Sequence, residues 1–482
     1  MSIEDKRVYL VPSTNEDNNA FVGVRIRNES IEFHYPESYD LSGVDETLTI
    51  KDLKAMRRDM IDILHTISLA KTRSFATQKT ENGVSTTQNF AFMSYLWIIR
   101  DYITNGIYRN TEKIYRNNAK GRVNWKKTLA TQPIISNGNI IYNNLVVEVI
   151  NDCDSILTDA HRLCIYNSIR KVGWLFGINE KAFYVPSPTK NLLKKYVNTI
   201  KLELKKTFDD TKKSRLNHML KVLSGVDDSK QISEIVYGVD KYHYVYERMV
   251  DAIFSNIVDI TKYNPNASWF IKEGNTYEEK EASSLRPDTV RIDDSPKTYL
   301  YDTKTKTAYV LDAKFYRYGS TGKKDDLPET TSIQKQITYA THIKNNLSKE
   351  EKIEHIHNAF VLPYNKNKNS FNFNENLVYI GFSKANWVKD DTKTLENIEQ
   401  LISSLPLNSN QEGLEALIKI VKDYAKEQDD TNNGVVHAFL IDTKHLVTSW
   451  SQGNCKEDIE RLINDIETYV ENHNEWHLKC NK

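Results

Sequence analysis

The segment AYVLDAKFY, residues 308–316, constrains the fold of this chain more than any other stretch. Its first half is an uninterrupted apolar run, which is typical of a strand covered on both faces. Side chains two residues apart on a strand point to the same side. We therefore expect Asp312 and Lys314 to share one face and Ala313 to lie on the other. The segment predicts a buried strand that ends in a carboxylate beside an ammonium group.

The glycine-containing segment that follows, Gly319–Lys323, has a superficial likeness to a phosphate-binding loop. Such a loop needs a glycine five positions before its second glycine, where this chain has Arg317, and Ser or Thr after the lysine, where it has Lys324. The next two residues are acidic and would repel phosphates, and no G-x-G-x-x-G pattern occurs elsewhere. We predict a polar loop here and no nucleotide-binding role for the chain.

A D-x-K triplet can arise by chance in a lysine-rich chain, and Asp442-Thr-Lys444 is a second one. The context of the first is more informative, because Pro287-Asp288 opens another strand-like run upstream. Proline fits the first position of a strand, where its missing N–H costs nothing. Aspartates at the ends of neighbouring strands are hard oxygen ligands suited to Mg²⁺. A lysine beside them can stabilise negative charge that develops on a phosphodiester.

Two helical patterns flank these strands. Residues 243–258 have apolar side chains on one side and carry Glu247, which can supply a third acid. Residues 332–347 carry Gln334, Lys335 and Gln336, polar groups that can reach a phosphate or a water molecule. The ordered set is an acid on a helix, two strand-end aspartates with a lysine, and then Gln or Lys on a second helix.

The order of elements after residue 230 predicts an α/β layer (α+β overall for the whole chain), with a mixed sheet flanked by helices. The first fifty residues contain short strand-like runs, and polar helices dominate from there to about residue 223. We therefore expect two domains. Residues 1–230 would recognise DNA or a partner, and residues 231–482 would form the catalytic domain with a strand–helix extension.

Composition excludes some classes of function. The 65 basic and 65 acidic residues cancel, so nucleic-acid affinity must come from local patches. The four cysteines form no C-x-x-C pair, and there is no signal peptide, which together predict a cytoplasmic location. His355 with His357, and His477 with Cys480, lack the four-ligand set of a structural zinc site. No window approaches the roughly 20 apolar residues that span a bilayer, so no membrane role is expected.

One local patch stands out in the segment from Tyr108 to Lys127. Its basic residues alternate with aromatic and amide side chains, a composition that can follow a DNA backbone. The candidate DNA-binding residues are Arg109, Arg116, Lys120, Arg122, Lys126 and Lys127. The alternative is a solvated hairpin with Trp125 in the core. A second basic stretch, from Lys190 to Lys221, has acids mixed in and is better explained as a solvated helix face.

The ordered set of acids, lysine and glutamine resembles the PD-(D/E)XK nuclease superfamily, with Pro287-Asp288 and Asp312-Ala-Lys314 in place of its signature. The series RPD, VLDAKFY and QKQITY is similar, more narrowly, to the LlaJI family of restriction endonucleases, which is related to the nuclease subunits of modified-cytosine restriction systems. The segments DYITNGIYRN, GRVNWKKTL and HAFLIDTKHL also resemble that family. The likeness touches about residues 100–445 through scattered motifs.

The resemblance implies a restriction-endonuclease-like fold and a role for each matching residue. Asp288 and Asp312 would bind metal, Lys314 would be the catalytic lysine, and Glu247 would be a helical acid that also serves the metal. Gln336, or Lys335 beside it, would be an auxiliary active-site residue.

The activity implied is that of a type II-like, site-specific deoxyribonuclease in a restriction-modification system for phage defence. It would use one or two Mg²⁺ ions to hydrolyse double-stranded DNA, leaving 5′-phosphate and 3′-hydroxyl ends. Its partners would be a second copy of the chain or a cognate methyltransferase system. Two alternatives stay open: a nuclease subunit that needs a separate GTP-hydrolysing motor, and a non-catalytic DNA-binding or scaffold protein with a nuclease-like fold.

Overall fold

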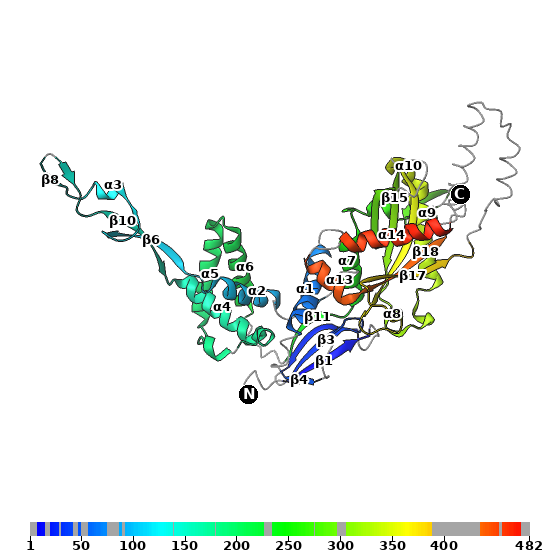
Figure 1. The fold of residues 1–482 in the computed structure, drawn as a ribbon, viewed down its shortest axis with the longest axis horizontal. Helices are drawn as coiled ribbons and strands as arrows, with labels where there is room; N and C mark the ends of the chain where they lie inside the picture. The colour runs from blue at the N-terminus through cyan, green and yellow to red at the C-terminus, as the bar shows by residue number, and fades with distance from the viewer. Residues whose placement is uncertain are drawn as a thin grey trace, which may run out of the picture.

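The structure of the chain is a computed structural model, shown in Figure 1. It describes residues 7–14, 20–27, 30–41, 47–49, 56–74, 86–88, 92–137, 139–178, 180–225, 234–273, 275–295, 305–387, 434–452 and 456–473.

The amino-terminal part is built on a six-stranded sheet with the order β4-β1-β3-β2-β11-β5. Its strands are β1 (Arg7–Ser13), β2 (Val22–Arg27), β3 (Ser30–Pro36), β4 (Thr47–Thr49), β5 (Thr86–Gln88) and β11 (Glu234–Val239). Strand β11 follows the helices and the expected boundary at residue 230, yet it pairs with both β2 and β5. The chain thus returns to this sheet before it enters the next one.

Helices of the amino-terminal half lie beside this sheet. They are α1 (Arg57–Ser74), α2 (Phe92–Asn105), α4 (Ile156–Val172), α5 (Lys190–Lys206) and α6 (Asp210–Ser224), with short 3-10 turns η3 (Gly173–Phe176) and η4 (Glu180–Phe183) after α4. In α1, Met60, Ile63, Leu64 and Ile67 are all fully buried at helical spacing. Ser155 caps α4 by accepting the Thr158 N–H, which fixes where that helix begins.

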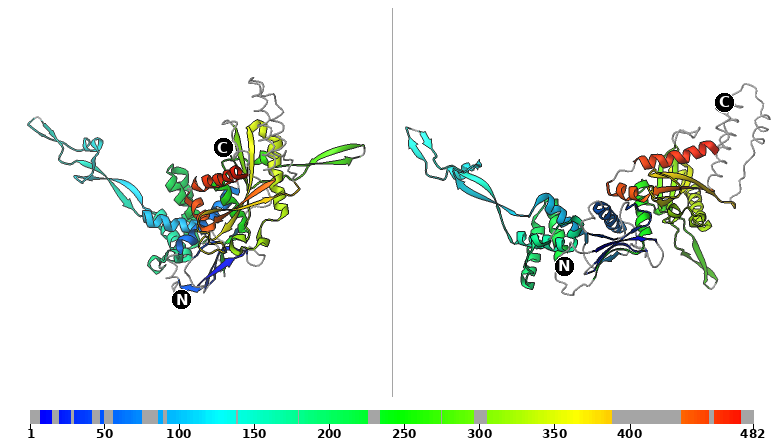
Figure 2. Two further views of the ribbon diagram at one scale, coloured as in Figure 1. Left: turned by 45° about the vertical axis from the view of Figure 1, so that its right-hand side comes forward. Right: turned by 60° about the horizontal axis from the view of Figure 1, so that its bottom comes forward.

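A long arm, residues 110–153, projects from α2 and α4, as both Figure 1 and Figure 2 show. Its shaft is the three-stranded sheet β6-β10-β7, and its tip is the hairpin β8–β9. The elements are β6 (Asn110–Asn117), β7 (Arg122–Val123), α3 (Trp125–Thr128), β8 (Ile134–Ser136), β9 (Asn139–Ile141) and β10 (Val146–Cys153). Trp125 is 60% exposed on α3, so the idea that it sits in a core is wrong.

The carboxy-terminal part contains a five-stranded mixed sheet with the order β14-β15-β16-β18-β17. The strands are β14 (Thr289–Asp294), β15 (Lys306–Ala313), β16 (Ile353–Tyr364), β17 (Leu377–Lys384) and β18 (Val435–Asp442). Strands β15, β16 and β18 are parallel to one another, and the edge strands β14 and β17 are antiparallel to their neighbours. Every residue of β15 after Lys306 is buried, so the expected strand covered on both faces is confirmed.

Helices cover both faces of this sheet. The remaining elements are α7 (Tyr242–Phe254), η5 (Thr261–Tyr263), α8 (Tyr318–Thr321), η6 (Lys324–Asp326), α9 (Thr330–Asn346), α10 (Ser348–Glu351), α13 (Thr443–Gln452) and α14 (Lys456–His473). Tyr309 and Leu311 of β15 belong to a core that continues through α7 and α13 into α1 and the amino-terminal sheet. Ala308 and Val310, on the other face, pack with Tyr339 and Ile343 of α9.

A second projecting element, the hairpin β12 (Ser268–Glu273) and β13 (Thr276–Glu281), stands out from the carboxy-terminal part in Figure 2. All twelve of its residues are exposed. Sequence analysis missed this hairpin. For the arm, it expected mainly polar helices in this half of the chain and gave a solvated hairpin as the alternative for the segment from Tyr108 to Lys127, which does contain strands. The charged segment from Leu414 to Lys426, whose sequence is amphipathic, lies outside the described residues.

Candidate active site

Asp312 and Lys314 meet at the carboxyl end of β15. The Lys314 Nζ lies 2.8 Å from the Asp312 Oδ2, and the exposed fractions of the two side chains are 20% and 7%. Burial disfavours the charged form of Lys314, but the charge of Asp312 and its hydrogen bond outweigh burial and raise the lysine pKa. Lys314 is therefore a firmly protonated cation at neutral pH. The shared face that the i, i+2 spacing predicts is confirmed.

Asp288 joins this pair from the residue just before β14. Its Oδ2 accepts the Ala313 N–H at 3.0 Å, which fixes the carboxylate against the end of β15. Burial, the charge of Asp312 and a hydrogen bond to Asp312 raise the pKa of Asp288 well above its usual range. Two neighbouring carboxylates repel each other, so the pair shares a proton unless a bound cation neutralises the second negative charge.

Glu247 approaches the same aspartates from α7. The helix packs on the sheet through Tyr246 and Val250, which are fully buried, and Glu247 is half-buried beside them. Burial raises the pKa of Glu247 to about 7, and the charge of Asp312 adds to the shift. Its carboxyl therefore belongs to the electrostatic environment of the strand-end pair.

Helix α9 contributes two side chains on the opposite side of the sheet. Gln336 is fully buried, and within the described residues neither its Nε2 nor its Oε1 has a hydrogen-bond partner. Tyr339, one turn further on, donates its hydroxyl to the Arg286 carbonyl at 2.9 Å. Burial raises the pKa of Tyr339, and the charges of Asp312 and Asp288 add to that shift, which places its ring beside the aspartates. Sequence analysis missed Tyr339, although its i, i+3 spacing from Gln336 was a usable signal.

The donor chemistry of the strand-end pair suits a divalent cation. Buried, mutually repelling carboxylates are hard ligands whose repulsion such an ion relieves. No group of three or more His, Cys, Asp or Glu side chains among the described residues is arranged to hold a metal. A pair of aspartates completed by water still suits Mg²⁺, which keeps several waters in proteins. Asp288 and Asp312 are thus the residues that fit a metal, and Glu247 stays a prediction as a third ligand.

The glycine-containing segment after this site has a structural role. Gly319 lies in α8 against β16, and a Cβ there would come within 2.1 Å of the Pro363 carbonyl oxygen. Gly322 ends α8 with a φ of 68°, a conformation that favours glycine. Lys323 and Lys324 are exposed. The two glycines thus serve the packing of α8 against β16 and the end of that helix.

The second D-x-K triplet is also structural. The buried Asp442 carboxylate accepts the His445 N–H at the start of α13 and the Lys366 N–H. Lys444 points to the amino-terminal part, where its Nζ lies 2.9 Å from the Asp59 Oδ2. Burial raises the pKa of Asp442, and the N–H groups of Lys366 and His445 that donate to its carboxylate oppose this shift.

Five of the six predicted DNA-binding residues lie on the arm, which projects away from β15 and the rest of the carboxy-terminal sheet in Figure 1. On one face of the shaft, Lys113 pairs with Glu148 at 2.6 Å, and the Lys127 Nζ lies 3.2 Å from the centre of the Tyr115 ring. The five residues of the predicted set that lie on the arm are all exposed: Arg116 on β6, Lys120 in the turn, Arg122 on β7, and Lys126 and Lys127 on α3. The tip has a different character, since Ile134, Ile135, Ile140 and Ile141 are exposed there.

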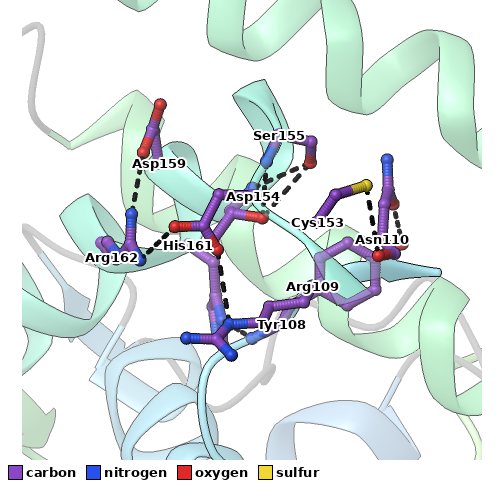
Figure 3. Close-up of polar contacts among 10 residues, drawn as sticks. Tyr108, Arg109, Asn110, Cys153, Asp154, Ser155, Asp159, His161 and Arg162 are labelled. Carbon is purple, nitrogen blue, oxygen red and sulfur yellow. Dashed lines mark hydrogen bonds and ion pairs between the residues drawn. The ribbon is translucent and has the colours of Figure 1, made fainter. Parts of the chain in front are cut away.

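Arg109, the sixth predicted DNA contact, lies at the root of the arm (Figure 3). Its Nε is 3.3 Å from Asp154, which also pairs with Arg162 at 2.7 Å. The Tyr108 N–H donates to the Nδ1 of His161, which is fully buried in α4. Arg109 is thus part of the junction that fixes the arm to α4.

Comparison with known proteins agrees with this description. The sequence profile of the LlaJI restriction endonuclease family matches residues 21–389. That match covers well over half of the chain, so the chain belongs to the LlaJI restriction endonuclease family, and the expected resemblance is confirmed. No helix among the described residues is long and apolar enough to cross a membrane.

Two individual proteins are also similar. The type II restriction enzyme BsuMI component YdjA of Bacillus subtilis (strain 168) is 25% identical over 276 residues, which cover 55% of this chain and 56% of that protein. A solved half-complex of Thermococcus gammatolerans McrB AAA+ hexamers with bound McrC matches at 12% identity and a TM-score of 0.28, over 71% of this chain and 70% of that chain. That superposition is too loose to carry an argument.

Proposed function

We propose that this chain is a Mg²⁺-dependent endonuclease that hydrolyses phosphodiester bonds of double-stranded DNA in a restriction system. The observation that carries the proposal is the meeting of three side chains at the end of β15: Asp288 accepts the Ala313 N–H at 3.0 Å, and the Lys314 Nζ lies 2.8 Å from the buried carboxylate of Asp312. Membership of a restriction endonuclease family supports it. Clustered like charges with shifted pKa values are typical of functional sites, which favours an enzyme over a scaffold.

The side chains have distinct roles in this proposal. Asp288 and Asp312 would hold the cation, which neutralises a phosphodiester and acidifies a water molecule when bound. Lys314, already protonated, supplies fixed positive charge where the phosphate becomes more negative in the transition state. The unsatisfied amide of Gln336 can orient a water or a phosphate oxygen. Helices α7 and α9 both contact β15, and they pack on opposite faces of the sheet.

The test is cleavage of DNA by the purified chain with Mg²⁺ or with EDTA, with the ends of the products sequenced. Asp312→Ala is expected to remove cleavage while DNA binding survives. Asp442→Ala, in the structural triplet, is the matched control and is expected to lower the stability of the protein while the folded fraction still cuts. Full cleavage by Asp312→Ala would show that the site is elsewhere.

A second candidate function keeps the same chemistry but makes the chain one subunit of a larger enzyme. The relative from Bacillus subtilis is named as a component of a restriction enzyme. The exposed isoleucines at the tip of the arm are the kind of surface that a protein partner covers. Incubation with DNA and Mg²⁺, without nucleotide or partner, separates the two. Cutting at discrete sites supports a self-sufficient enzyme, and no cutting until a nucleotide-hydrolysing subunit is added supports the second candidate.

A further inference from the structure

Two arginines flank the acidic cluster and have no role in the proposed chemistry. Arg248 directly follows Glu247 on α7, and Arg286 lies two residues before Asp288, just ahead of β14. Both side chains are half-buried. They come from different elements, so their convergence on one place depends on the packing of α7 against β14.

Neither guanidinium has a partner in the described part of the chain, where no hydrogen bond or ion pair involves the side chain of Arg248 or Arg286. Other partly buried arginines nearby are engaged. Arg291 pairs with Asp293 at 2.5 Å and donates to the Phe254 carbonyl at 3.3 Å. Both guanidiniums are only partly buried, and within the described residues none of their nitrogens is a buried atom without a partner, so water satisfies them and a ligand can replace that water.

The charges of the two arginines act on each other and on the acids. Burial lowers the pKa of Arg248, and the nearby charge of Arg286 lowers it further, while Asp251, Glu247 and Asp288 act in the opposite direction. Both arginines also act electrostatically on Glu247. Two like charges are therefore kept close together beside the carboxyl pair.

Arg286 is held in place through its main chain. The Tyr339 hydroxyl donates to the Arg286 carbonyl, and the Asp288 carboxylate is fixed by the Ala313 N–H. Arg248 is carried by α7, and the two residues that follow it, Met249 and Val250, are fully buried. Rigid backbones thus present two free guanidinium groups at the edge of the carboxyl pair, as a site prearranged for an anion requires.

We propose that Arg248 and Arg286 form a clamp that binds a backbone phosphate of the DNA strand to be cut, next to Asp288 and Asp312. The inference rests on the proposed nuclease function and deepens it. A phosphate diester supplies the acceptors that both guanidiniums lack, and each planar fork can bind two of its oxygens. The clamp sets the position of the strand, and Lys314 acts separately at the reacting phosphate.

The experiment measures binding of the full chain to a fluorescent DNA duplex in EDTA, across a range of salt concentrations. Arg248→Ala and Arg286→Ala are each expected to weaken binding about tenfold. The double variant should lower the slope of log affinity against log salt by about 1, because one phosphate contact is lost. Arg461→Ala removes the same charge from the exposed face of α14, and it should bind as the wild type does.

Conservative variants separate a phosphate contact from a folding defect. Arg248→Lys and Arg286→Lys keep the charge but lose the planar fork, so the salt slope should recover while affinity recovers only in part. Wild-type affinity and slope in the double alanine variant would overturn the clamp, as would a loss of binding that Arg461→Ala shares. Cleavage by the wild type with Mg²⁺ is scored separately. If the wild type cuts DNA but the arginine variants bind it normally, the clamp is refuted and the nuclease proposal stands. If the arginine variants bind DNA more weakly but the wild type never cuts, the nuclease proposal is refuted and the clamp stands.

Discussion

At the residue scale, the two D-x-K triplets provide an internal comparison. Lys314→Ala removes fixed positive charge from the reacting phosphate, so we expect cleavage to fall at least 100-fold, by about 3 kcal/mol. Lys444→Ala removes a partly exposed ion pair with Asp59. We expect this change to lower stability by at most about 1 kcal/mol and to leave cleavage unchanged. Single-turnover cleavage and urea denaturation of both variants check this. Equal loss of cleavage in both variants would contradict a catalytic role for Lys314 and a structural role for Lys444.

His161 gives a prediction on the pH dependence of stability. Burial lowers the pKa of His161 to about 4, and the charge of Arg215 contributes, so the folded state keeps this side chain neutral. The unfolded state binds its proton near pH 6.5, which means that stability is complete above that pH and falls as the pH drops toward 4. The expected loss is about 3 kcal/mol. His161→Asn, which can still accept the Tyr108 N–H, should unfold with a flatter pH dependence in that range.

Asp101 also makes the protein less stable as the pH falls, but through protonation of a carboxylate. Although burial opposes ionisation, hydrogen bonds from Arg215 and Asn105 hold its pKa below the usual range. Its contribution to stability is present above its unfolded pKa and is lost only at more acidic pH, as the pH falls through its folded value. The loss between pH 6.5 and 4 therefore belongs mainly to His161, and Asp101→Asn should lower stability at neutral pH as well, by about 3 kcal/mol.

At the scale of elements, the arm has two surfaces that suit different partners: a basic shaft that suits DNA and an apolar tip that suits a protein. If its shaft contacts DNA, the triple variant Arg116→Ala, Arg122→Ala, Lys126→Ala should lower the salt slope of DNA binding by about 3. The matched variant Ile135→Ser, Ile140→Ser changes only the exposed apolar tip and should leave that slope unchanged. An unchanged slope in the triple variant, with assembly lost in the tip variant, would assign the arm to a protein partner instead.

The same elements show what sequence can and cannot predict. The strand β15 and helix α1 were predictable because their buried side chains produce a recognisable sequence pattern, an apolar run in the strand and apolar residues at helical spacing in the helix. The arm and the β12–β13 hairpin are exposed over most of their length, so no such pattern exists for them. In the site, Asp312 and Lys314 followed from strand periodicity. Arg248 and Arg286 come near the aspartates only because α7 packs against β14, and local spacing does not encode that packing.

At the scale of the whole molecule, the amino-terminal sheet and the five-stranded carboxy-terminal sheet share one core. Buried residues from Val8 to Ile466 form a single cluster that passes through α1, α7 and α13. Polar contacts reinforce it, because Arg317 pairs with Glu37 at 3.0 Å and Asn367 donates to Asp40 at 2.7 Å. Whatever the boundary near residue 230 means for function, this packing couples the stability of the two parts.

We therefore expect a mutation in α1 to inactivate the distant nuclease site by unfolding it. Ile63→Ala removes a fully buried side chain and should cost about 2–5 kcal/mol. Thermal unfolding followed by circular dichroism should shift to lower temperature, and residual cleavage after heating should fall along the same curve. Arg58→Ala, on the exposed side of the same helix, should leave both curves unchanged. A first transition that spares cleavage would show two independent parts, because a shared core does not allow one sheet to unfold while the other stays packed.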